Sequence, residues 1–346
     1  LEKYGMDVTY EFCDLPTAFK ASAVEVDNPK GRLAILCEYD ALPEVGHACG
    51  HSASGAMSVL AALTLHKMQE GVAFSMDIDI IGTPDEEAMG CKVDMCNAGV
   101  FKEYDFAIMV HLDGEETRPN SQFLALDCFR AKYHGKPAHA AGEPWNGINA
   151  VNGVQLAIHA MDMMRQQVRP ETRIGTWIIA GGTASNVIPA FGELEVTVRH
   201  TEREYLNGLS EQIKKIFEGA ALCTGTTVDV EFYGNPYDDM NQNNRGTALI
   251  EEVMADMGLD FEPGPAAFGG SSDIGNVSYQ CAAFHPKLRL AGEPKVCHSK
   301  EFAAAMLEPT IEQTIIDGAN IIGGALLRPV ENPTTLEEIV AEFKRS

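Results

Sequence analysis

The first third of the chain alternates between short apolar runs and a segment with helical spacing. Residues 32–40, RLAILCEYD, form a continuous apolar run ending in carboxylates, which predicts a strand buried in a parallel sheet. Ser52 is a predicted N-cap for a helix that runs to about Gln69. Apolar and polar side chains alternate in residues 73–81, AFSMDIDII, and residues 105–111, DFAIMVH, are another short apolar run. Together these segments predict βαβ units.

The pattern changes near Pro119. A strand, a helix, two strands, a helix and a strand are then predicted at residues 121–133, 147–166, 172–180, 192–199, 202–221 and 226–232. This is the element order of a ferredoxin-like domain. Helices and short strands alternate again after residue 239, and Thr335 with Glu338 predicts a capping box near the end.

These patterns predict an α/β protein with two domains. Residues 1–120 and 240–346 would form a discontinuous catalytic domain, a mixed, mostly parallel sheet flanked by helices. Residues 121–239 would form an inserted ferredoxin-like α+β domain that acts as a lid and dimerisation domain. A chain of 346 residues, 45% of them hydrophobic, is long enough for two such cores.

Charge and cysteine content narrow the classes of partner. The formal charge of −24 repels phosphate backbones and anionic membranes, so we expect neither nucleic-acid nor membrane partners. Nine irregularly spaced cysteines predict reduced thiols and a cytoplasmic location. The opening LEKYG reads as the end of a helix capped by Gly5, so we expect further residues upstream.

Side chains of the types that bind metals occur in four separated stretches: HACGH, GTPDEEAMG, IMVHLDG and PKVCHSKEF. Each has an ordinary explanation when taken alone, such as a tight turn, a solvated acidic turn, a core histidine or a loop residue. Three of these side chains, Glu86, Glu87 and His111, follow the predicted parallel strands, as does Asp40 at the end of residues 32–40. Because the carboxyl ends of parallel strands share one edge of a sheet, we expect these residues to converge.

The combined set of sulfur, nitrogen and oxygen donors suits zinc, or manganese if oxygen and nitrogen dominate. Its members are Cys49, His51, Glu87, His111 and His298. A bound metal lowers the pKa of its water to about 7, and a neighbouring carboxylate that is not a ligand, here Glu86, can take the proton. This arrangement predicts metal-assisted hydrolysis. In a competing hypothesis, Cys49 is a nucleophile with His47 or His51 as its base.

The chain resembles the aminoacylase and glutamate-carboxypeptidase superfamily of two-metal peptidases, clan MH. Within it, the likeness is to the amidohydrolase branch that includes aminobenzoyl-glutamate hydrolase and the β-alanyl-lysine type dipeptidases. The resemblance rests on motifs spread in order along nearly the whole chain: EYDALPEVGHACGH, GTPDEE, VHLDG, GKPAHAAGEPWNGINA, GGTASNVIPAFGELEVTVR, EGAALCTGTTVDV, GSSDIGNVS and CHSKEF.

The resemblance implies two divalent ions, zinc or manganese, with Cys49 a plausible bridging ligand among the five donors. It implies that Glu86 is the general base and acid and that Asp40 orients His51. The expected substrate is a small N-acyl-amino acid or dipeptide. Two departures keep a small polar residue: Ser52 stands where the branch usually has Asp or Asn, and Ser299 where it usually has Thr.

Three residues of the inserted domain also gain roles from the resemblance. Family members dimerise through this domain, and its histidine, here His139, reaches the active site of the partner. Asn186 would help to hold the tetrahedral oxyanion, and Arg199 would bind the substrate carboxylate. Without the resemblance, these would be read as a turn histidine, a loop-capping asparagine and a surface arginine. A metal-bound protein without catalysis, serving ligand binding or assembly, is the alternative function.

Overall fold

The computed structural model describes residues 1–345, apart from the side chain of Phe268. The chain divides into two compact units. The first unit combines Leu1–Phe123 with the chain from Met240 onward, and the second is Leu124–Asp239. Among the residues that the structure describes, no helix has the length and apolar character needed to cross a membrane.

The first unit is built on a six-stranded sheet with the order β1-β2-β4-β3-β5-β13. The strands are β1 (Val8–Tyr10), β2 (Phe19–Val24), β3 (Arg32–Glu38), β4 (Asp77–Thr83), β5 (Phe106–Ile108) and β13 (Ala282–Phe284). Strands β4, β3, β5 and β13 are parallel to one another, whereas β1 and β2 are antiparallel additions at one edge. The predicted mixed, mostly parallel sheet is therefore confirmed.

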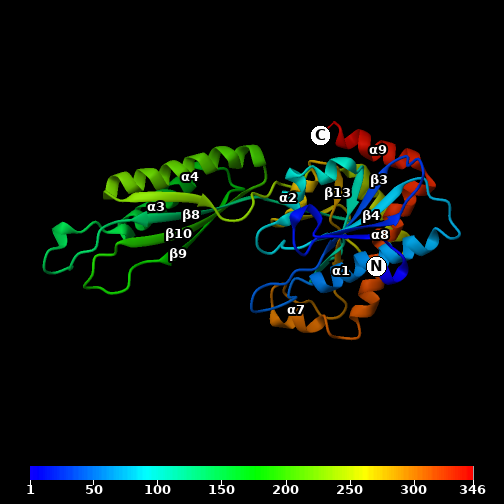
Figure 1. Ribbon diagram of the computed structural model, residues 1–346, viewed down its shortest axis with the longest axis horizontal. Coiled ribbons are helices and arrows are strands. Elements are labelled where there is room, and N and C mark those ends of the chain that lie inside the picture. Colours follow the sequence, from blue (N-terminus) through cyan, green and yellow to red (C-terminus); the bar gives the residue numbers. More distant parts are fainter. Residues whose placement is uncertain (346) are drawn as a thin grey trace. The chain divides into compact units, whose positions relative to one another are not determined.

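Side chains of the central strands enter two separate cores, one on each face of the sheet. In β3, Leu33 and Ile35 belong to one core, and Ala34 and Leu36 belong to the other. Helices α1 (His51–Met68), α5 (Asn244–Asp256), α8 (Ile311–Glu331) and α9 (Pro333–Phe343) pack on the first face, and α2 (Cys91–Asn97) and α6 (Ile274–Val277) on the second (Figure 1). Burial on both faces explains why β3 reads as an unbroken apolar run.

Two short parallel strand pairs complete this unit. Strand β6 (His111–Asp113) pairs with β14 (Lys287–Arg289), and β7 (Asn120–Phe123) pairs with β12 (Pro265–Gly270). Helix α7 (Lys300–Ala305) follows the loop that carries His298. The apolar run at residues 105–111 is thus divided between β5 and the first residue of β6.

The second unit has a four-stranded antiparallel sheet with the order β11-β8-β10-β9. Its elements in chain order are β8 (Ala125–His134), α3 (Ala150–Met164), β9 (Arg173–Ala180), β10 (Phe191–His200), α4 (Arg203–Thr224) and β11 (Thr227–Phe232) (Figure 1). Strand β10 alternates between buried and partly exposed residues because α3 and α4 cover one face of this sheet.

Two predicted caps are wrong. The N-cap of α1 is Gly50, not Ser52, and its backbone is left-handed with φ 83°. A Cβ at this position would lie 2.8 Å from the Leu112 side chain, so glycine is required for this turn to pack against β6. Helix α9 begins at Pro333, with Asn332 as its N-cap, because proline suits the first turn of a helix. Thr335 therefore lies inside the helix, where it is buried, and does not cap it.

Candidate metal centre

The candidate donors gather beyond the carboxyl ends of three parallel strands. Strand β3 ends at Glu38, β4 at Thr83 and β5 at Ile108. The turn after β4 carries Glu86 and Glu87, and His111 follows β5 closely. The sheet therefore supplies one edge at which groups distant in sequence meet.

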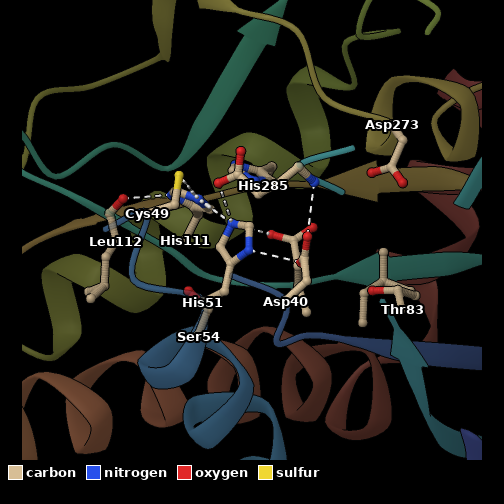
Figure 2. A network of polar contacts seen from close by, with 12 residues as sticks. Asp40, Cys49, His51, Ser54, Thr83, His111, Leu112, Asp273 and His285 are labelled. Carbon is tan, nitrogen blue, oxygen red and sulfur yellow. Dashed lines mark hydrogen bonds and ion pairs between the residues drawn. The ribbon is translucent and has the colours of Figure 1, made fainter. Parts of the chain in front are cut away.

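Two histidines face each other through their Nε2 atoms, which are 3.2 Å apart. His51 Nδ1 lies 3.0 Å from Asp40 Oδ1, and His111 Nδ1 lies 2.6 Å from the Leu112 carbonyl oxygen. Since these oxygens only accept, both Nδ1 atoms donate, so a ring that is neutral directs the lone pair of its Nε2 at the other Nε2. Figure 2 shows the His51 ring between Asp40 on one side and His111 with Cys49 on the other. Two ring nitrogens at this distance require a cation, either a proton on one ring or a bound metal ion.

Cys49 brings sulfur to the same place. Its Sγ lies 3.7 Å from His111 Nε2 and 3.2 Å from His298 Nε2. His298 is exposed and has a left-handed backbone with φ 65°, and its N–H donates to the Ala48 carbonyl at 2.8 Å. Ser299 then caps α7 by accepting the N–H of Phe302. The His298 loop is thus tied at both ends, once to the HACGH turn and once to a helix.

The donor atoms form three overlapping groups, and within each group they lie within 4.8 Å of one another. The groups are Cys49/His51/His111, Cys49/Glu87/His298 and Glu38/His51/Glu86. Cys49 and His51 are the shared members. Thiol, imidazole and carboxylate donors in this proximity suit zinc or a similar divalent ion.

A buried oxygen of Glu87 supports the fit to a metal. Glu87 Oε1 has no hydrogen-bond partner among the described residues and lies 3.9 Å from His51 Nε2. The Glu87 backbone N–H donates to Asp40 Oδ2 at 2.9 Å, so Asp40 holds both His51 and the glutamate turn. An unsatisfied buried carboxylate oxygen is costly unless an ion or a proton meets it.

The two facing histidines have different pKa values. Burial disfavours the charged form of His51, but Glu38 and Asp40 outweigh this and raise its pKa to about 9. Burial and the neighbouring His51 lower the pKa of His111 to about 4. His51 is therefore the ring that carries the additional proton at neutral pH, and its Nε2 lies 3.1 Å from Glu38 Oε1 and 3.2 Å from His111 Nε2.

Glu86 and Cys49 are perturbed in ways that bear on their roles. Burial, followed by the charges of Glu38 and Asp273, raises the pKa of Glu86, which suits a group that holds and releases a proton. Burial and the Glu87 carboxylate raise the pKa of the Cys49 thiol. A thiol nucleophile requires a lowered pKa, so the protein environment disfavours the thiol mechanism. His47 belongs to none of the three donor groups among the described residues.

Sequence reasoning missed four buried residues around these donors. Glu38, Lys92 and Asp273 form a chain of buried charges, and His285 stacks on His111 with ring centroids 5.1 Å apart. Glu38 was visible as the first carboxylate of EYD, and Asp273 lies in the GSSDIGNVS motif. Lys92 gave no signal, because CKVDMC reads as an ordinary amphipathic segment.

The other three candidate residues belong to the second unit. His139 is exposed, and its Nδ1 accepts the N–H groups of Ala141 and Gly142 at 3.2 and 3.0 Å. The neutral ring therefore carries its proton on Nε2, where it can donate outward. Asn186 lies next to His139, since its carbonyl accepts the Ala140 N–H at 3.0 Å. Arg199 lies on β10, and its buried Nε has no hydrogen-bond partner among the described residues.

Known proteins are similar to this chain in sequence and in fold. Over 339 residues, the chain is 33% identical to a Xaa-Arg dipeptidase of Mus musculus, covering 95% of this chain and 78% of that protein. It is 30% identical over 250 residues to one of the polypeptides of p-aminobenzoyl-glutamate hydrolase from Escherichia coli K12, covering 67% of this chain and 51% of that polypeptide.

A solved structure of a dinuclear metal-binding peptidase of the M20 family from Bacillus subtilis has the same fold. It superposes with a TM-score of 0.68 at 17% identity, over 96% of this chain and 90% of that one. Residues 34–324 match the model of peptidase family M20/M25/M40. With most of its length in that match and its donors gathered at one sheet edge, the chain belongs to peptidase family M20/M25/M40.

Proposed function

We propose that the protein is a metal-dependent hydrolase that cleaves the amide bond of dipeptides or N-acyl-amino acids. The observation that carries this proposal is the pair of facing histidine Nε2 atoms next to the Cys49 thiol. Relatives named as a dipeptidase and as an aminobenzoyl-glutamate hydrolase support the reaction class. All nine cysteines are free thiols, which supports a cytoplasmic location.

Two divalent ions, zinc or manganese, would be held by five residues: Cys49, His51, Glu87, His111 and His298. When bound, such ions lower the pKa of water and polarise a carbonyl oxygen. Cys49, shared by two donor groups, is suited to bridge them. Asp40 keeps the Nε2 lone pair of His51 directed at the site by accepting its Nδ1 proton.

Glu86 would take the proton from the attacking water as the carbon–oxygen bond forms. It would return that proton to the departing amine nitrogen as the carbon–nitrogen bond breaks, so that acid and amine are released. The half-buried position of Glu86 and its raised pKa support this role. Its neighbour Glu87, with a free buried oxygen, is the member of the pair suited to a metal.

The second unit is proposed to be a ferredoxin-like lid and dimerisation domain, bounded by residues 121–239. Its His139 and Asn186 would donate to the tetrahedral oxyanion, a role that the Nε2 proton of His139 supports. Arg199 would bind the carboxylate of the substrate through its planar guanidinium. By family resemblance, His139 serves the active site of the other protomer of a homodimer.

The test of the function is a hydrolysis panel with zinc-loaded and manganese-loaded protein. The panel contains Xaa-Arg dipeptides, β-alanyl dipeptides, N-acyl-glutamates and N-acyl-lysines. We expect turnover of at least one class, and Glu86→Gln should lower kcat by about 10²–10⁴-fold with unchanged metal content. No hydrolysis, or an unaffected Glu86→Gln variant, would contradict the proposal. Full activity in a strong chelator would instead favour the Cys49 thiol mechanism.

Mixed dimers test the role of His139. Glu86→Gln and His139→Ala are each expected to be inactive alone. After unfolding and refolding together in equal amounts, about half of the dimers should be mixed, each with one of its two sites intact, so the sample should recover about a quarter of wild-type activity. No recovery, with mixed dimers demonstrated by mass spectrometry, would mean that His139 acts in its own protomer, whereas an active His139→Ala variant would mean that it has no role.

A further inference from the structure

A carboxylate outside the five donors faces the coordinating nitrogen of His51. Glu38 is the last residue of β3 and is 1% exposed. Its Oε1 lies 3.1 Å from His51 Nε2. Because Asp40 accepts the Nδ1 proton of His51, the ring faces this oxygen with Nε2, which carries either a proton or, when a metal ion is bound, a lone pair. Two electron-rich atoms at this distance attract only when a cation joins them.

The spacing is that of two ligands on one ion. Donors about 2.0–2.1 Å from a tetrahedral zinc lie about 3.3 Å from each other. His51 Nε2 is 3.2 Å from His111 Nε2 and 3.1 Å from Glu38 Oε1, so the two neighbours are equivalent in distance. Glu87 Oε1, buried and unpaired among the described residues, lies 3.9 Å from the same nitrogen. Of the residues near this nitrogen, Glu38 and Glu86 form with His51 a group whose donor atoms all lie within 4.8 Å of one another.

The second oxygen of Glu38 is fixed by a buried lysine. Lys92 Nζ donates to Glu38 Oε2 at 2.5 Å and to Asp273 Oδ1 at 2.7 Å, and the Lys92 N–H donates to Asp273 Oδ2 at 3.0 Å. Lys92 and Asp273 are both 0% exposed. Because Oε2 is committed to Lys92, only Oε1 is directed at His51. Because Glu38, Lys92 and Asp273 are buried and paired with one another, the Glu38 carboxylate is held in one orientation.

We propose that Glu38 is a further oxygen ligand of the metal centre, with Lys92 and Asp273 as residues that position it. The inference rests on the proposed function, since it assumes that a divalent ion occupies the site. It assigns to one ion a donor set of Glu38 and His51 next to Glu86, the donor group that does not include the Cys49 sulfur. Oxygen donors there would make this ion the one more readily filled by manganese.

The experiment is a metal titration of the Glu38→Gln variant, by equilibrium dialysis against buffered zinc and manganese with metal analysis. The matched control is Asp79→Asn. Asp79 is also a buried carboxylate of this sheet, bound by Tyr104 and Lys20, but it pairs with Ala34, four residues before Glu38. We expect Glu38→Gln to bind one of two ions at least about 10-fold more weakly, while Asp79→Asn binds both as wild type does.

Cobalt(II) substitution supplies a second readout. Glu38→Gln should change the visible d–d bands of one ion and leave the charge-transfer band from the Cys49 thiolate in place. If Glu38→Gln does not fold, the shorter Glu38→Asp variant replaces it. This variant keeps the negative charge but places its oxygen farther from the ion, so it should weaken the binding of the same ion. Titrations within two-fold of wild type in the variant that folds, with unchanged cobalt spectra, would overturn the inference. Wild-type protein that binds no metal would overturn the proposed function as well, whereas wild-type binding and turnover would leave it standing.

Discussion

The two sides of the metal centre are built differently. The closed side, defined here as Glu38, His51 and Glu86, is mostly buried and extends inward through Lys92 and Asp273. The open side, defined as Cys49, Glu87 and His298, comes from turns and a loop, and His298 is exposed. In the part of the chain that the structure describes, only the closed side is continuous with a chain of buried ion pairs.

This difference separates stability from metal binding. A buried charge that loses its partner destabilises the fold strongly, whereas an exposed side chain can be removed at little cost. Variants on the closed side should therefore lower the stability of the metal-free protein. Variants on the open side should weaken metal binding and leave the metal-free fold intact.

Lys92→Met is expected to have the largest effect on stability. It leaves Glu38 and Asp273 as buried carboxylates without a cation, which should cost about 3–5 kcal/mol of unfolding free energy. Urea unfolding of the metal-free protein measures this loss. Lys132→Met is the control, because Lys132 pairs with Glu231 at the surface of the second unit, and its urea midpoint should stay near that of wild type. Equal urea midpoints for Lys92→Met and Lys132→Met would show that the closed side does not support the metal-free fold.

His285→Phe should change the pH dependence of stability. Burial, followed by the charges of His111 and Lys287, lowers the pKa of His285 well below its usual value of 6.5. The unfolded chain therefore binds more protons below about pH 6.5, and stability is lost as the pH falls through this value. Removing the imidazole should reduce the slope of unfolding free energy by up to about 1.4 kcal/mol per pH unit between pH 6 and 5.

Urea unfolding at several pH values measures this slope in the metal-free protein. Phenylalanine keeps an aromatic ring between His111 and Phe123. His159→Phe, at an exposed position on α3, is the matched control. An unchanged slope in His285→Phe would mean that this histidine does not contribute to acid sensitivity.

His298→Ala should have the smallest effect on the fold. The residue is exposed and in a left-handed conformation, so the unfolding free energy of the metal-free protein should change by less than about 0.5 kcal/mol. Metal affinity should nevertheless fall, because one ligand of the open side is lost. Calorimetric metal titration beside urea unfolding would separate the two effects. A large loss of metal-free stability would show that the open side also supports the fold.

The sequence by itself determined the sheet and the nature of the donors. The apolar run of β3 predicted a strand that the structure contains, because burial on both faces leaves an unbroken apolar run. The alternation at residues 73–81 overlaps β4, but this strand begins at Asp77 and its later residues are all buried. The motifs identified the family, since Cys49, His51, Glu87 and His111 lie in distinctive stretches. Local caps were less predictable: the close approach of Gly50 to Leu112 decided the start of α1.

Only the tertiary structure decided which charges meet. Lys92 and Asp273 are 181 residues apart, and no periodicity relates them, yet they share a hydrogen bond in the core. The same holds for Glu38, whose orientation depends on Lys92 at one oxygen and His51 at the other. Sequence patterns report whether a position faces water or a core, because burial repeats along each element. They do not report which buried charge neutralises which, because that depends on distances set by the whole fold.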